Sequence, residues 1–272
     1  MESEGIIMKL LTINVHSWIE ENQLEKIDIL ARTIAENDYD IVAMQEVNQI
    51  MTSPVVYSDI REDNYGWILL NKIAEYTDTV YYYHWSNSHI GYGIYDEGIG
   101  ILTKHELKNT DDFYCTRSHT VRSISSRKII SAEIEYKGHE MEFYSCHMNL
   151  PTNKDENMID NIQTVLNRNK NNVIKVLMGD FNTDAISSTE DYEKIKEQGL
   201  YDTYEMAEEK DSGITVSKNI HGWDNDMGKK RIDYIFIDRK VKVLKSTVIF
   251  NGINKPVISD HFGVEVDILI EE

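Results

Sequence analysis

The sequence predicts a mixed α/β fold, and two stretches of the chain carry this prediction. Near its start, an apolar strand over residues 8–15, a helix over 24–34 and a second apolar strand over 40–46 follow one another, an order that favours parallel pairing. Later, alternating strands over 127–136 and 140–147 are separated by a short turn, which favours antiparallel pairing. The expected sheets are therefore mixed.

Composition sets broad limits on the protein. With 272 residues and 41% hydrophobic content, the chain can bury a large core, and no linker interrupts it, so we expect one domain over residues 1–272. No stretch approaches the roughly 20 apolar residues of a membrane span, and residues 1–4 are acidic where a signal peptide is basic. Cys115 and Cys146 lie in unlike contexts, so a disulfide framework is not expected. We expect a cytoplasmic monomer.

The first half of the chain continues with helical and strand patterns. Asn22 and Glu25 are spaced like a capping box at the start of the first helix. A second helix is expected over 65–76, followed by an aromatic stretch over 81–85. That stretch could stack nucleobases, but a half-buried strand explains its aromatic content better. A strand over 98–103 follows, introduced by Glu97.

The second half alternates helices and strands around one long loop. The expected helices cover 156–169 and 189–198, and the expected strands cover 176–180, 231–237, 241–250 and 263–270. The polar segment over 213–230 reads as a surface loop. It contains His221 and Trp223, for which substrate contact and simple loop packing are equally good interpretations.

The motif Gly179-Asp180-Phe181-Asn182 closes an apolar strand abruptly, so a carboxylate and an amide project from the strand end. Taken alone, the motif has two interpretations: a reactive site, or an Asx-turn in which Asp180 and Asn182 only bond nearby backbone. His147, in an apolar strand, would by itself be read as a satisfied core histidine. The choice between a reactive site and a structural role depends on the polar residues at the ends of the other strands.

Further polar residues interrupt or end apolar strands along the whole chain. The full set is Asn14, Glu46, Glu97, His147, Asp180, Asn182, Asp233, Asp260 and His261. Burying several carboxylates at one core edge is costly unless a cation joins them. Oxygen ligands together with substrate phosphate suit Mg²⁺, with Mn²⁺ as a substitute, whereas zinc would recruit more histidine or cysteine.

In this order, the motifs resemble the endonuclease/exonuclease/phosphatase superfamily, which includes deoxyribonuclease I, exodeoxyribonuclease III, neutral sphingomyelinases and inositol polyphosphate 5-phosphatases. The resemblance runs from about residue 10 to residue 266 and rests on these motifs: Asn14, Gln45-Glu46, His147, Gly179-Asp180-Phe181-Asn182, Arg231-Ile232-Asp233-Tyr234 and Ser259-Asp260-His261. It implies a four-layer α/β sandwich, in which two facing mixed β-sheets are flanked by helices.

The resemblance also implies roles for residues around the metal and the water. Glu46 resembles the principal metal ligand, with Asn14 and Asp260 near the same ion. Asp180 and Asn182 would position and deprotonate the attacking water.

For the phosphate, the resemblance implies that His261 contacts it while Asp233 fixes the histidine tautomer. His147 would stabilise the phosphate or protonate the leaving oxygen. Glu97 resembles the glutamate that supports that histidine, and Arg127 resembles an arginine near the phosphate.

The expected activity is Mg²⁺-dependent phosphoester hydrolysis, and the substrate stays open between two classes. A nuclease-like phosphodiesterase, endo- or exonucleolytic, is the first; a small or lipid-like phosphoester, such as an inositol phosphate, sugar phosphate or nucleotide, is the alternative. The net charge of −19 repels a polyanion, although basic residues gather modestly over 117–128 and 229–231. A non-catalytic binding domain is disfavoured by the complete set of acids and histidines.

Overall fold

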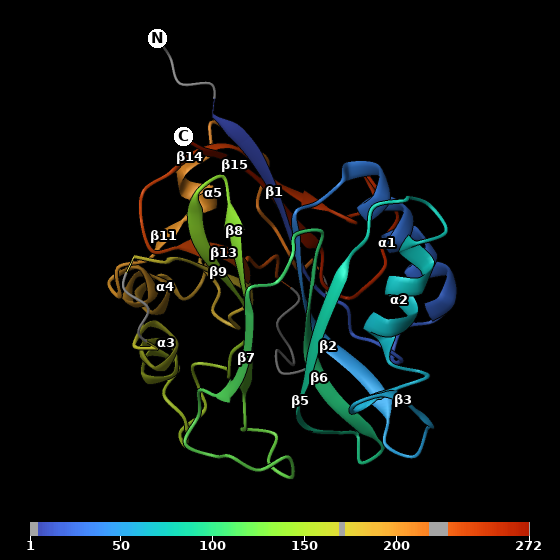
Figure 1. Ribbon diagram of the computed structural model, residues 1–272. Helices are drawn as coiled ribbons and strands as arrows, with labels where there is room; N and C mark the ends of the chain where they lie inside the picture. The colour runs from blue at the N-terminus through green and yellow to red at the C-terminus, as the bar shows by residue number, and fades with distance from the viewer. Residues whose placement is uncertain (1–4, 169–171, 218–227, 272) are drawn as a thin grey trace.

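The chain builds two facing β-sheets whose outer faces are covered by helices (Figure 1). A computed structural model describes residues 5–168, 172–217 and 228–271. The four-layer α/β sandwich expected from the sequence is confirmed. None of the helices in these ranges is long and apolar enough to cross a membrane.

The first sheet has seven strands in the order β12-β14-β15-β1-β2-β6-β5. Their bounds are β1 Ile6–Asn14, β2 Ile41–Ile50, β5 Tyr82–Gly91, β6 Tyr95–Thr103, β12 Glu209–Lys210, β14 Lys242–Ile249 and β15 Gly263–Ile270. Strands β1 and β2 pair in parallel, as the strand–helix–strand opening predicts, whereas β15 is antiparallel to β1. The sheet is mixed.

The second sheet has six strands in the order β11-β13-β10-β9-β8-β7. Their bounds are β7 Asn109–Tyr114, β8 Lys128–Tyr136, β9 His139–His147, β10 Ile174–Asp180, β11 Tyr201–Asp202 and β13 Asp233–Ile237. The predicted hairpin of β8 and β9 is present, and β10 runs parallel to β9. A separate small ribbon pairs β3 (Val55–Tyr57) with β4 (Ile60–Arg61).

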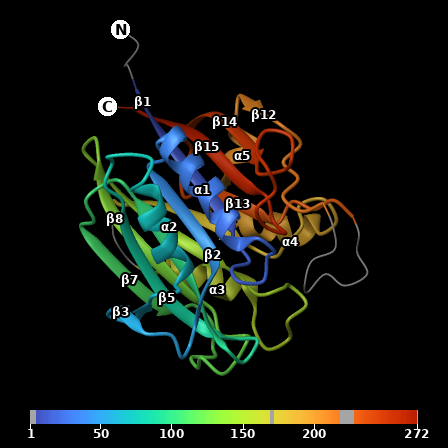
Figure 2. The same ribbon diagram turned by 90° about the vertical axis from the view of Figure 1, so that its right-hand side faces the viewer.

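Helices cover each sheet from outside. Figure 2 shows α1 (Gln23–Asn37) and α2 (Tyr65–Ile73) lying over the outer face of the first sheet, where Ile27, Leu30 and Ile34 join a buried apolar cluster. On the second sheet, α3 (Met158–Leu166) and α4 (Thr189–Lys196) do the same. The short helix α5 (Thr203–Met206) follows β11. Between the sheets, aliphatic residues of both inner faces form the central core.

Several local predictions from the sequence are wrong. Asn22 is in the left-handed region and makes no side-chain cap, so the capping box is absent. Glu46 does not end its strand: β2 continues to Ile50, because a bulge lets the strand absorb this residue and pair onward. Glu97 lies inside β6. The strands β3, β4, β7, β11 and β12 and the helix α5 were not expected at all.

Candidate active site

Strand register places three polar side chains side by side at the end of the second sheet. Asp180, the last residue of β10, pairs with His147 of β9 on one side and Asp233 of β13 on the other. Gly179 makes this approach possible: its φ is 146°, and a Cβ there would lie 1.9 Å from the Cys146 carbonyl oxygen. A glycine is therefore required directly before Asp180.

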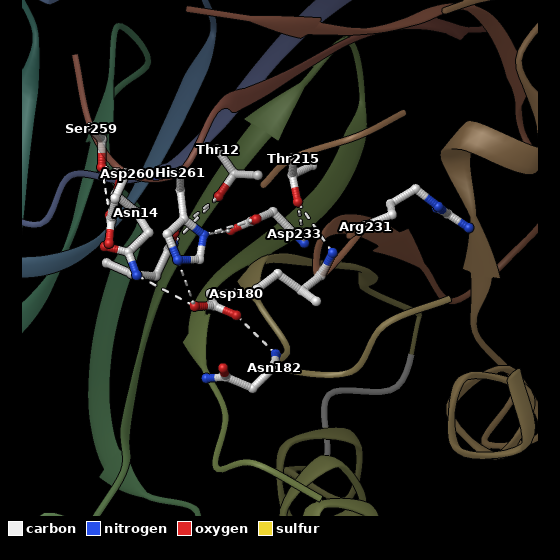
Figure 3. A network of polar contacts seen from close by, with 12 residues as sticks. Thr12, Asn14, Asp180, Asn182, Thr215, Arg231, Asp233, Ser259, Asp260 and His261 are labelled. Atoms are coloured by element: carbon white, nitrogen blue, oxygen red, sulfur yellow. Dashed lines mark hydrogen bonds and ion pairs between the residues drawn. The ribbon is translucent and has the colours of Figure 1, made fainter. Parts of the chain in front are cut away.

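The two carboxylate oxygens of Asp180 have separate partners, so the Asx-turn forms and still leaves one oxygen facing the other polar strand ends. Oδ1 accepts a hydrogen bond of 2.8 Å from the Asn182 backbone N–H, which is an Asx-turn. Oδ2 instead faces the site: Asn14 donates to it at 3.3 Å, and Nε2 of His261 lies 3.8 Å away (Figure 3). Nε2 of His147 lies 3.7 Å from the same oxygen. The turn orients the carboxylate through Oδ1 and leaves Oδ2 directed into the site.

Glu46 reaches the same place from the first sheet through a strained backbone. Its φ is 54°, and the pairing of β2 with β6 shifts register between Met44 and Val47. A bulge of this kind re-aims a side chain. Asn14 at the end of β1 donates to Glu46 Oε1 at 2.8 Å, while its own Oδ1 accepts the His16 backbone N–H at 3.1 Å. Asn14 thus holds Glu46 and Asp180 together and presents its NH₂ group to them.

His261 and Asp233 form a buried pair. His261 Nδ1 lies 3.1 and 3.0 Å from the two Asp233 oxygens, which leaves Nε2 directed at Asp180 (Figure 3). Burial opposes a charge on the ring, but Asp233 and Asp180 together raise the pKa of His261 well above its usual range. The Thr215 hydroxyl accepts the Asp233 backbone N–H at 3.3 Å and holds that strand start in place.

A group that the sequence did not indicate lies beside Asp260. His16 Nδ1 is 2.8 Å from Glu20 Oε1 and 3.6 Å from Asp260 Oδ1. Ligand atoms of these three residues lie within 4.8 Å of one another, as do those of Asp180, Asp233 and His261. The position of His16, two residues after Asn14, was the one available signal. Lys26 already pairs with Glu20 at 2.6 Å.

The electrostatics of the site fit a bound cation. Burial, reinforced by Glu97 and Asp260, raises the pKa of Glu46 to about 7. Burial and the Asp233 charge raise the pKa of Asp180 to about 7. Within the described ranges, no lysine or arginine forms an ion pair with Glu46, Asp180 or Asp260. Carboxylate oxygens gathered without a lysine or arginine partner are the donor set that a hard divalent ion uses.

His147 and Glu97 are not partners. Burial, with Arg127 and other histidines nearby, lowers the pKa of His147 well below its usual range. Glu97 Oε1 lies 3.2 Å from Nε2 of His89, so the expected support of His147 by Glu97 is not the contact that forms. No motif in the sequence singles out His89. Arg127 Nε donates to Asn149 Oδ1 at 3.2 Å.

One cavity of about 510 Å³ joins these groups. Its walls include Glu46, Glu97, Arg127, His147, Asp180, Asn182, Asp260 and His261, together with His16 and His89. Asn14 and Asp233 lie behind this wall: Asn14 is hydrogen-bonded to Glu46, and Asp233 is hydrogen-bonded to His261. The predicted substrate residues His221 and Trp223 lie outside the described residues.

Comparisons with known proteins identify the family and the fold. The model of the Endonuclease/Exonuclease/phosphatase family matches residues 19–261. A solved structure from Leptotrichia buccalis, described as an endonuclease/exonuclease/phosphatase family protein, is 61% identical with a TM-score of 0.92, over 96% of this chain and 99% of that one. None of the curated proteins matches.

More distant solved structures share the fold. The mannosyl-6-phosphatase of Bacteroides thetaiotaomicron is 19% identical with a TM-score of 0.70, over 97% of this chain and 100% of that one. A humanized TDP2 from D. rerio is 17% identical with a TM-score of 0.63, over 96% and 98% of the two chains.

Proposed function

Because the chain belongs to the endonuclease/exonuclease/phosphatase family, whose members are metal-dependent phosphoester hydrolases, we propose that it hydrolyses a small phosphoester with the help of Mg²⁺. The single observation that carries this proposal is the meeting of Glu46, Asp180 and His261 at one cavity without a lysine or arginine partner among the described residues.

The metal site draws on the first sheet and the loop before β15. Glu46 and Asp260 offer carboxylate oxygens to the ion, which when bound neutralises charge on the phosphate. Asn14, which presents N–H rather than oxygen to Glu46, acts by holding that carboxylate in position. In this proposal Asn14 supports the metal ligand Glu46 and is not itself the ligand that the sequence had suggested.

Water activation draws on the second sheet through Asp180, and phosphate contact draws on His261 from the loop before β15. Asp180 Oδ2 accepts the proton of the attacking water, since its other oxygen is fixed by the Asn182 N–H. His261, held by Asp233 and kept charged, donates from Nε2 to the phosphate. His147 is neutral and lies 3.7 Å from Asp180, so it accepts or relays a proton rather than adding charge. Arg127 supplies a guanidinium to the substrate.

The charge of the cavity favours a small substrate over a polynucleotide. A protein that binds nucleic acid contacts many phosphates with lysines and arginines. Among the described residues that line this cavity, Arg127 alone belongs to those two types, and the whole chain carries −19. One guanidinium with two histidines suits one phosphate group. The mannosyl-6-phosphatase neighbour is a protein of this fold named for a small phosphoester.

A substrate panel tests the proposal. Purified protein is assayed with Mg²⁺, Mn²⁺ or EDTA against aryl phosphate mono- and diesters, alkyl phosphates, plasmid DNA and single-stranded oligonucleotides. We expect turnover of small esters that EDTA abolishes and Mg²⁺ restores, at least tenfold more efficient than cleavage of either nucleic acid. Metal-independent turnover, or none on any ester, would overturn the proposed chemistry. Faster cleavage of DNA would retain that chemistry but reassign the substrate to the nuclease class.

A further inference from the structure

The His89–Glu97 pair lies on the cavity wall formed by β5 and β6. The two residues face each other across the strands, and Oε1 of Glu97 is 3.2 Å from Nε2 of His89. His89 is 2% exposed and Glu97 is 8% exposed. His89 Nδ1 is buried and has no hydrogen-bond partner among the described residues. The fold tolerates this unsatisfied nitrogen while the other ring nitrogen, Nε2, faces the carboxylate. Leaving such an atom unsatisfied is costly.

The second oxygen of Glu97 is kept clear of protein. None of the described residues donates a hydrogen bond to Oε2. Gly91 borders this oxygen, and a Cβ at that position would lie 2.4 Å from it. The glycine is not needed for a turn here, because it belongs to β5 and its φ is not in the left-handed region. The absence of a side chain at Gly91 therefore lets the Glu97 carboxylate take this position on the cavity wall.

Glu97 lies on a cavity wall that carries both polar and apolar groups. Tyr92, Ile124 and Leu150 line the same cavity, and the first two are 58% and 65% exposed. Asn149 is already engaged: it accepts from Arg127 and donates to the Ser125 carbonyl. Glu97 Oε2 is thus an acceptor on the cavity wall that no described residue occupies, and a few such polar groups fix the orientation of a ligand in a pocket.

We propose that the His89–Glu97 pair is a specificity subsite for a hydroxyl group of the alcohol portion of the substrate. The preferred substrates are then phosphate esters of polyols, with the carbon skeleton against Tyr92 and a hydroxyl donating to Glu97 Oε2. This inference rests on the proposed function. It gives Glu97 a role in recognition in place of the support of His147 that the sequence suggested.

Two other ligands of a carboxylate fit less well. A second metal ion would need further ligands, but no third histidine, cysteine, aspartate or glutamate of the described residues completes a close group with Glu97 and His89. An ammonium group on the substrate would meet the nearby Arg127, which acts electrostatically on Glu97 together with His89. A neutral hydroxyl donor avoids both difficulties.

Matched substrates and variants test the subsite. Glycerol phosphate, propyl phosphate and phosphoethanolamine are compared as monoesters and as methyl diesters, with wild type, Glu97→Gln, Gly91→Ala and the control Asp40→Asn. Asp40 is also a buried carboxylate beside a histidine, His105, but does not line the cavity. We expect wild type to favour the glycerol ester over the propyl ester by at least tenfold in kcat/KM, because a site built for a hydroxyl rejects the analogue without it.

The preference should collapse to within threefold in Glu97→Gln and in Gly91→Ala, chiefly through KM, and survive in Asp40→Asn. Equal use of the two esters by wild type would overturn the subsite while leaving the hydrolase intact, as would a preference for phosphoethanolamine. A rise in the Mg²⁺ requirement of Glu97→Gln on every substrate would identify a second metal ion instead. Absence of turnover on all esters would count against the proposed function itself.

Discussion

Two carboxylates of strand β2 and its approach have opposite surroundings: Asp40 just before the strand, and Glu46 at the bulge inside it. Asp40 accepts the Lys9 backbone N–H at 2.7 Å, and its other oxygen lies 2.7 Å from His105 and 3.2 Å from Lys104. Burial opposes its charge, yet these partners lower the pKa of Asp40. Among the described residues Glu46 accepts a hydrogen bond from Asn14 alone, and burial with acidic neighbours raises its pKa to about 7.

Burial alone therefore does not distinguish a structural carboxylate from a functional one. Both carboxylates are largely removed from water, but of the two only Asp40 has a lysine and a backbone N–H as partners among the described residues. The pKa of Glu46 is raised instead, and so is that of Asp180 across the gap between the sheets. A fold that keeps carboxylates in such surroundings leaves room for a ligand to offset the cost.

The largest expected effect is loss of activity on replacing Asp180. Asp180→Asn keeps the acceptor for the Asn182 N–H but removes the base, so kcat/KM should fall about 10³-fold, within the range of general base catalysis. The melting temperature at pH 7 should stay the same or rise, because burial and the Asp233 charge raise the pKa of Asp180 and so make its ionised form unfavourable in the folded state. Steady-state kinetics and thermal unfolding measure both. Activity near that of wild type would refute the role given to Asp180.

Metal binding should stabilise the folded protein through Glu46, and this stabilisation should not depend on Asp40. A cation that binds only the folded chain stabilises it by about 2.7 kcal/mol at one hundred times its Kd. Mg²⁺ should therefore raise the melting temperature of wild type and of Asp40→Asn, but have little effect on Glu46→Gln. Unfolding is followed with EDTA and with increasing Mg²⁺. An equal rise in all three proteins would place the ion elsewhere.

The sequence predicted the strand ends of the site better than its interior positions. Asn14, Asp180 and Asp233 stand where an apolar run begins or stops, so local pattern and the geometry of neighbouring strands bring them together. Glu46 was expected at a strand end, but a bulge places it within β2, and a bulge depends on pairing with β6 rather than on local sequence.

Pairing also explains why His89 was missed. It faces Glu97 only because the register of β5 and β6 shifts after Asn87, which no local periodicity encodes. The polar strand β7 was missed for a related reason: it lies at the edge of its sheet and is mostly half-buried or exposed, so it lacks the apolar run that marks a central strand.

The smallest expected effect is the loss of stability on replacing Asp40, the carboxylate with cationic partners. Because its folded-state pKa is lowered, Asp40 contributes stability that is present above its unfolded pKa of about 4 and is lost as the pH falls through the folded value. Asp40→Asn should lower the free energy of unfolding at pH 7 by about 1–3 kcal/mol, as for a broken buried hydrogen-bond set, and the difference from wild type should shrink below pH 4. Urea unfolding across this range measures it, with the exposed Glu135→Gln as control. A difference that stays constant with pH would show that the charge of Asp40 does not contribute to stability. The contrast between Asp40 and Glu46 would then come from packing and not from charge.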